Sequence, residues 1–199
     1  MNHKELVSRL MASVERQMPA KRWKHTLGVV SCSKSLAASF GADAEKAEIA
    51  AILHDVAKFW PVERQREAIL HEGAEVALGA LDYDKDLWHA HAGAYAAKRE
   101  YGIEDTEILD AIRYHTSGRA GMTLLEKVVC LADYIEPGRD FPGVEDIRRL
   151  AEKSLEKALL AAFDGTIVSL LRKRKRIYPL TVYTRNDLLE TIIAREAEE

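Results

Sequence analysis

Apolar residues recur along the chain at the three- and four-residue spacing of amphipathic helices, and proline, glycine and short polar residues separate the segments. Residues 6–14 predict a first helix on this spacing. Pro19 is placed to open a second helix that ends at Gly41. Asp43 is placed to cap a third helix, which the apolar spacing continues through Val56.

The rest of the chain follows the same pattern. Further helices are predicted over residues 61–73, 84–102, 108–116, 123–135 and, in segments, 144–171. Thr184 and Asp187 resemble a capping signal, so a last helix is expected there, after the break at Tyr178 and Pro179. Strand patterns are scarce. The sequence therefore predicts an all-α fold, a helical bundle of about ten helices.

Composition places this chain among folded soluble domains. Its 199 residues suit one domain, and the hydrophobic and charged fractions are 47% and 31%. The net charge of −3 provides no overall attraction to nucleic acid. No apolar run is long enough to cross a membrane, and the N-terminus does not resemble a signal peptide. We interpret Cys32 and Cys130 as buried free thiols, which suits a cytoplasmic protein.

The segment AILHDVAKFW, residues 51–60, places a histidine and an aspartate side by side in an apolar helical pattern. A buried carboxylate is costly unless a cation accompanies it. Adjacent helical residues diverge by about 100° around the axis. His54 and Asp55 can therefore flank one point beside the helix, and a metal at that point would bind both if other helices supplied the remaining ligands.

His25, in WKHTLGVV, and Asp133, in VVCLADYIEPG, are candidates for those remaining ligands. A lone histidine on an apolar face is more often a hydrogen-bonded core residue, so the argument depends on the joint pattern of four residues. Their mixed nitrogen and oxygen donors suit a divalent transition metal such as Fe, Mn, Co or Zn better than Ca. Such a site would keep positions open for water and a substrate oxygen.

Three further residues converge on this site by spacing. Lys58 follows Asp55 by three residues and is expected on the same helix face, to bind phosphate or neutralise Asp55; the alternative is a surface lysine with a buried stem. His89 and His115 each interrupt an apolar pattern. His91 points to another side of the helix from His89, so His89 is preferred. His3 and His71 are expected to be exposed.

Two other segments each leave two interpretations open. SGRAG, residues 117–121, is an interhelical turn or a flexible loop whose glycines let a phosphate or base approach. RKRKR, residues 172–176, is a solvated face of a late helix or a basic cluster that steers a polyanion to the site. RNA binding is less favoured, because interleaved exposed aromatic residues are lacking.

The order His25, His54-Asp55, Asp133 resembles the signature of the HD-domain metal-dependent phosphohydrolases. The segments AILHDVAK, LWHAHAGAYAAKREYGI, AIRYHTSGRAGMTLLEKVVCLADYIEPGR and YPLTVYTRN resemble the YqeK-like HD-domain proteins over about residues 22–186. Trp88 and Ala90 depart from the leucine and glycine usual there, which could alter the pocket wall. Members of that family are symmetrical diadenosine tetraphosphate hydrolases that release two ADP.

This resemblance implies an all-α, iron-binding, cytoplasmic homodimer that acts on a dinucleoside polyphosphate and not on a membrane or nucleic acid. One HD domain would span residues 1–199, with a core at about 20–140 and C-terminal helices at 144–199 packed on it. An HD-domain nucleotidase or alarmone hydrolase with another nucleotide substrate stays open as an alternative, as does a nucleotide-sensing or RNA-associated binding module.

The resemblance also implies roles for residues. The metal ligands would be His25, His54, Asp55 and Asp133. The catalytic residues would be Asp55, Lys58, His89 and His115, with His89 or His115 protonating the leaving ADP or holding a second metal. The nucleotide-binding residues would be His25, Asp55, Lys58, His89, His115, Thr116, Asp133, Arg139, Arg176, Ile177, Tyr178, Pro179 and Thr181. The segment from Arg176 to Thr181 would close over the nucleotide.

Overall fold

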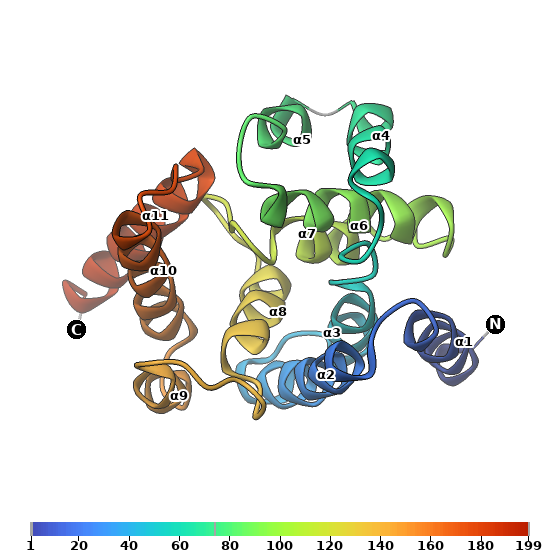
Figure 1. Ribbon diagram of the computed structural model, residues 1–199. Helices are drawn as coiled ribbons and strands as arrows, with labels where there is room; N and C mark the ends of the chain where they lie inside the picture. Colours follow the sequence, from blue (N-terminus) through green and yellow to red (C-terminus); the bar gives the residue numbers. More distant parts are fainter. Residues whose placement is uncertain (1, 74, 199) are drawn as a thin grey trace.

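The protein, analysed as a computed structural model that describes residues 2–73 and 75–198, is built from helices (Figure 1). In chain order these are α1 (His3–Glu15), α2 (Ala20–Phe40), α3 (Ala44–Leu53), α4 (Val62–Glu72), α5 (Glu75–Ala80), the short 3₁₀ helix η1 (Lys85–Leu87), α6 (Trp88–Arg99), α7 (Thr106–Tyr114), α8 (Leu124–Ile135), α9 (Val144–Ala151), α10 (Leu155–Arg172) and α11 (Pro179–Glu196). The all-α prediction is confirmed.

The predicted helix ends are confirmed where a capping residue defines them. The Asp43 carboxylate accepts hydrogen bonds from the backbone N–H groups of Glu45 and Lys46, and so starts α3. Gly41 and Gly73 end α2 and α4 in the left-handed conformation, with φ of +79° and +67°. These local signals fix element boundaries without help from tertiary contacts.

Two predictions about helix boundaries are wrong, and one helix was missed. Helix α3 ends at Leu53, and residues 54–59 form successive turns, so His54, Asp55 and Lys58 are not on one regular helix. The last helix begins at Pro179, so Thr184 lies inside it and does not cap it; its hydroxyl donates to the carbonyl of Leu180. Helix α5 was not predicted.

The core is formed where α2, α3, α7 and α8 meet, and Figure 1 shows α8 near the centre of the molecule. One apolar cluster extends from Leu10 of α1 to Leu188 of α11. The alanines of α6 and Gly93 let this helix pack closely against the end of α3. A Cβ added at Gly93 would lie 3.5 Å from the His54 carbonyl oxygen. The domain boundaries inferred from the family resemblance stay a prediction.

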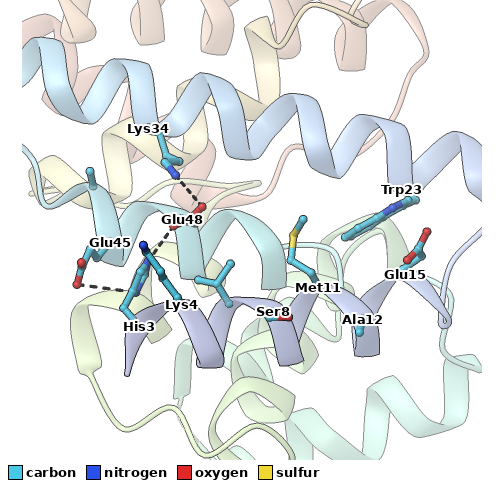
Figure 2. A pocket seen from close by; sticks show the side chains of 12 residues that line it. His3, Lys4, Ser8, Met11, Ala12, Glu15, Trp23, Lys34, Glu45 and Glu48 are labelled. Atoms are coloured by element: carbon cyan, nitrogen blue, oxygen red, sulfur yellow. Dashed lines mark hydrogen bonds and ion pairs between the residues drawn. The ribbon is translucent and has the colours of Figure 1, made fainter. Parts of the chain in front are cut away.

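A surface groove lies between α1, α2 and α3, and Figure 2 shows the side chains that line it. His3 is half-buried there, so the expectation that it is exposed is wrong. Its Nε2 lies 2.8 Å from Glu48 Oε2, and the other oxygen of Glu48, Oε1, pairs with Lys34. His71 is exposed as expected.

Cys130 is buried and free, but Cys32 is only partly buried. Across residues 2–73 and 75–198, no helix has the length and apolar character that spanning a bilayer requires.

Candidate metal centre

Four residues predicted as metal ligands come from separate elements and meet at one point. His25 lies in the first half of α2, His54 caps the end of α3, Asp55 follows it in the turn, and Asp133 lies in the last turn of α8. The packing of α2 and α3 against α8 therefore brings them together. Helix α3 ends at Leu53, so the turns of residues 54–59, and not a continuing helix, set the direction of the Asp55 side chain.

The ligand atoms are close enough to share one cation. His25 Nε2 lies 2.9 Å from Asp133 Oδ1 and 3.8 Å from Asp55 Oδ2. His54 Nε2 lies 3.2 Å from Asp55 Oδ2 and 4.0 Å from Asp133 Oδ1. Two imidazole nitrogens and two carboxylate oxygens form a donor set that suits a divalent transition metal.

The hydrogen bonds of the two histidines fit metal binding. His54 Nδ1 lies 2.7 Å from the carbonyl oxygen of Ala51, which can only accept, so Nδ1 carries the proton and Nε2 offers a lone pair. His25 Nδ1 lies 3.0 Å from Glu136 Oε1 and donates in the same way. Both Nε2 atoms and both oxygens of Asp55 are shielded from solvent and make no hydrogen bond of good geometry. A bound cation would satisfy them.

The second oxygen of Asp55 faces the other predicted catalytic residues. Asp55 Oδ1 lies 3.1 Å from His89 Nε2, 3.3 Å from Lys58 Nζ and 4.0 Å from His115 Nε2. The two histidine Nε2 atoms are 3.2 Å apart. Lys58 reaches Asp55 because each turn of residues 54–59 closes with an i to i+3 backbone hydrogen bond. Asp55 therefore belongs to two groups of residues that could each hold a metal ion, one with His25 and His54 and the other with His89 and His115.

The site holds its carboxylates ionised. Burial acts to raise the pKa of Asp55, but the neighbouring His54 and His89 rings hold it well below its usual range. Burial also acts to raise the pKa of Asp133, but the hydrogen bond with His25 and the charges of His54 and Arg139 keep it below the usual value. Burial beside the His54 and His89 rings lowers the pKa of His115 to about 3. Burial acts to lower the pKa of His54, but the carboxylates of Asp55 and Asp133 raise it, so a bound cation would take the place of the proton on this ring.

Two residues of the site were missed in the sequence. Glu136 supports His25, and its other oxygen accepts from the backbone N–H of Gly138 at 2.6 Å. A carboxylate behind a metal-binding histidine fixes the orientation of the ring and its tautomer. Arg22 lies 2.8 Å from Asp55 Oδ2. Their spacing could have revealed them, because residues three apart share a helix face. Arg22 precedes His25 by three residues, and Glu136 follows Asp133 by three.

Gly28, one turn after His25 on α2, makes room for Glu136. A Cβ at Gly28 would lie 2.3 Å from Glu136 Oε2 and 3.1 Å from its Cδ. Atoms not bonded to each other do not approach so closely. A side chain at this position would therefore displace the carboxylate that orients His25.

The residues assigned to nucleotide binding by resemblance lie at two places. Arg139 pairs with Asp133, donating to its carboxylate and to its carbonyl oxygen at 2.6 Å. Thr116 Oγ1 lies 3.0 Å from His115 Nε2. The segment from Arg176 to Thr181 leads into α11 and forms its first residues. The Thr184 hydroxyl of this helix lies 3.1 Å from the carbonyl oxygen of Ser117, which keeps α11 beside the loop that follows His115.

The same segment packs its tyrosine, which is buried, against an aromatic residue from the loop after α5. The Tyr83 and Tyr178 rings lie 5.0 Å apart, and the Arg176 guanidinium lies over the Tyr83 ring at 5.3 Å. Residues 172–176 are exposed, but only Arg172 belongs to α10 and residues 173–176 follow its end, so the expectation that this cluster forms a helical face is wrong. Within SGRAG, Gly118 lies against Thr184 and Phe163. Trp88 turns away from His89 to donate to the carbonyl oxygen of Ala80.

An all-α bundle that gathers a His/Asp cluster from separate helices defines the class of HD-domain proteins. The pattern of the HD domain matches residues 22–138, and the chain belongs to this family. A protein of Bacillus subtilis named bis(5'-nucleosyl)-tetraphosphatase, symmetrical, is 51% identical over 179 residues, which make up 90% of this chain and 95% of that protein. A protein of Halalkalibacterium halodurans with the same name is 46% identical over 88% of this chain and 93% of its own length.

A solved structure agrees with this assignment. It is described as a predicted HD superfamily hydrolase involved in NAD metabolism from Clostridium acetobutylicum, and it is 39% identical to this chain. The two folds superpose with a TM-score of 0.86 over 96% of this chain and 98% of that one. The similarity therefore includes α9 to α11, which lie beyond the HD pattern.

Proposed function

We propose that this protein is a metal-dependent phosphohydrolase that cleaves diadenosine tetraphosphate symmetrically into two ADP. The observation that carries the proposal is the double use of Asp55, whose Oδ2 faces His25 and His54 while its Oδ1 faces Lys58 and His89. One oxygen would bind the cation and the other would order the groups that meet the phosphate. The names of the similar proteins from two bacilli support the same substrate.

Each group of the site would have a part in that reaction. His25, His54, Asp55 and Asp133 would hold a divalent cation, which would supply Lewis-acid chemistry and lower the pKa of a bound water. Lys58 and Arg139 would offset the negative charge of the tetraphosphate, which otherwise repels an anionic nucleophile. Water would add to one central phosphorus and the bridging oxygen would leave with the other ADP, taking up a proton from His89. His115, whose pKa burial lowers to about 3, is neutral and would contact the phosphate or hold a second metal.

We further propose iron as the metal, a homodimer as the assembly and the cytoplasm as the location. His25, His54, Asp55 and Asp133 would be the iron ligands. Mn, Co and Zn suit the same nitrogen and oxygen donors. Metal analysis of protein purified without chelator, together with its mass in solution, tests the first two proposals.

Product identification tests the proposed activity. Metal-loaded protein is incubated with diadenosine tetraphosphate, a nucleoside monophosphate, a nucleoside triphosphate and a guanosine alarmone, and the products are separated by chromatography. Two ADP per substrate is the expected result. Formation of ATP and AMP, or no product beside rapid cleavage of another nucleotide, would refute the proposal. Tight nucleotide or RNA binding without turnover would indicate the binding-module alternative.

Asp55→Asn is the matching substitution. Because the amide is uncharged, the variant should lose its bound metal and its hydrolysis, while its helical content remains. Asp164→Asn is the control, since Asp164 is a half-exposed carboxylate on α10 that pairs with Arg185 at 2.8 Å. It should keep wild-type metal content and turnover. Equal metal content in both variants would contradict the assignment of Asp55.

A further inference from the structure

We infer that the cavity beside His25 binds one nucleoside diphosphate half of the substrate, and that Phe59 is the surface on which its base stacks. This inference rests on the proposed function, because a symmetrical dinucleotide cut at its centre needs a place for a nucleoside on each side of the metal. Of the residues implied by family resemblance, His25 and Arg139 reach this cavity from the metal centre, but the segment expected to close over a nucleotide, Arg176 to Thr181, belongs to the other side.

The metal centre has two distinct ends. At one end, His25 lies against Asp133 and Glu136. At the other end, His115 lies against His89 and follows α7, next to the loop that Thr184 holds to α11. Asp55 lies between the two ends, with one oxygen directed to each. A tetraphosphate centred on Asp55 would therefore extend its two adenosines in opposite directions.

A cavity of about 750 Å³ opens at the His25 end. This volume is within the usual range for small-molecule sites, roughly 300–1,000 Å³. The lining residues that matter to the argument are Lys21, Arg22, Lys24, Phe59, Pro137 and Arg139. His25 also lines the cavity, so its interior is continuous with the metal centre.

The charge of this cavity suits a diphosphate. Four of its lining residues are cationic, and the carboxylate of Glu136 is occupied by His25 and by the backbone of Gly138. Arg22 and Arg139 hold the two metal-ligand carboxylates at its inner end. Lys21 and Lys24 are exposed at its outer part and form no ion pair within residues 2–73 and 75–198. Phosphate oxygens would satisfy them.

Phe59 provides the apolar surface that a base requires. It follows Lys58, which faces Asp55, and it is 48% exposed although residues 54–57 of the turn are buried. A large aromatic ring exposed at the mouth of a basic cavity, with Pro137 also in its lining, is a stacking surface for a nucleobase.

Calorimetric titration of metal-loaded protein with ADP tests the inference by binding alone. Wild-type protein should bind two ADP per chain. Phe59→Ala should weaken one of these sites about tenfold or more, the usual effect of removing a stacked aromatic ring. Phe59→Trp should keep both sites, because it preserves the stacking surface. Leu70→Ala, which shortens an exposed apolar side chain on α4, is the control and should match wild type.

Turnover provides the second measurement. For diadenosine tetraphosphate, kcat/KM should fall about tenfold in Phe59→Ala and return in Phe59→Trp. Binding of only one ADP per wild-type chain, or equal ADP binding by Phe59→Ala and Leu70→Ala, would overturn the inference. The proposed function would still stand if the wild-type protein releases two ADP from each dinucleotide. If wild-type protein forms no ADP from the dinucleotide, the proposed function and the inference both fail.

Discussion

Replacing Gly28 by alanine tests whether Glu136 orients His25 for metal binding. The new Cβ would lie 2.3 Å from Glu136 Oε2, so the carboxylate must move by about 1 Å to restore ordinary van der Waals contact. The hydrogen bond from His25 Nδ1 to Glu136 Oε1 is 3.0 Å long, and a displacement of that size is enough to break it.

The expected size of the effect follows from the role of Glu136. Loss of a carboxylate behind a metal-binding histidine costs about 10–100-fold in metal affinity. This corresponds to about 1.4–2.7 kcal/mol of binding free energy. Alanine is also a better helix former than glycine by up to about 1 kcal/mol, so the unfolding free energy of the metal-free variant should not fall by much.

Gly165→Ala is the matched control for this substitution. Gly165 lies inside α10, and a Cβ there would meet no atom within 4 Å. Both variants gain helix propensity, but only Gly28→Ala disturbs Glu136. Competition titration against a chromogenic chelator measures metal affinity, and thermal unfolding measures stability. Metal affinity of Gly28→Ala equal to that of Gly165→Ala would refute the orienting role of Glu136.

Two further predictions concern stability. Gly118 has φ of +61°, and a Cβ there would lie 2.4 Å from the Thr184 methyl carbon. Gly118→Ala should therefore lower the free energy of unfolding, measured by chemical denaturation, by about 2 kcal/mol or more. Gly121 has φ of +68° and no close neighbour, so Gly121→Ala should lower it by about 1 kcal/mol, from backbone strain alone. Equal losses would contradict the contact with α11. Burial acts to raise the pKa of Glu156, but Lys127 and Arg195 hold it below its usual value. The charged form therefore stabilises the fold above the unfolded pKa, and this stabilisation disappears as pH falls through the folded pKa. Glu156→Gln should be less stable than wild type by about 2 kcal/mol at pH 7, with a difference that shrinks below about pH 4. A difference independent of pH would refute the ionic origin.

The sequence was most informative about the fold where a residue acts on its own neighbours. Asp43, Gly41 and Gly73 cap or end helices through local hydrogen bonds and backbone conformation, and these boundaries were predicted. The wrong boundaries depend on tertiary contacts. Thr184 has the composition of a capping residue, but its hydroxyl lies near the carbonyl oxygens of Leu180 and Ser117, and Pro179 starts the helix instead.

For the metal centre, the sequence predicted residues whose burial is chemically unusual. A histidine beside an aspartate in an apolar run needs a partner, and the structure places His25 and Asp133 within 4.0 Å of that pair. The supporting residues were missed because arginine and glutamate are ordinary at the ends of exposed helices. Arg22 and Glu136 acquire their meaning only when α2 packs against the end of α8.

The contact between the Ser117 carbonyl and Thr184 has a consequence for biosynthesis. The four candidate metal ligands and His115 lie before residue 138, yet the loop that carries His115 is held by Thr184, which is 67 residues after Ser117 in the chain. A ribosome-bound chain can gather the cation donors first, while the nucleotide side of the pocket waits for α11 to emerge. Premature termination near residue 170 would thus yield a polypeptide able to capture metal but poorly suited to retain its substrate.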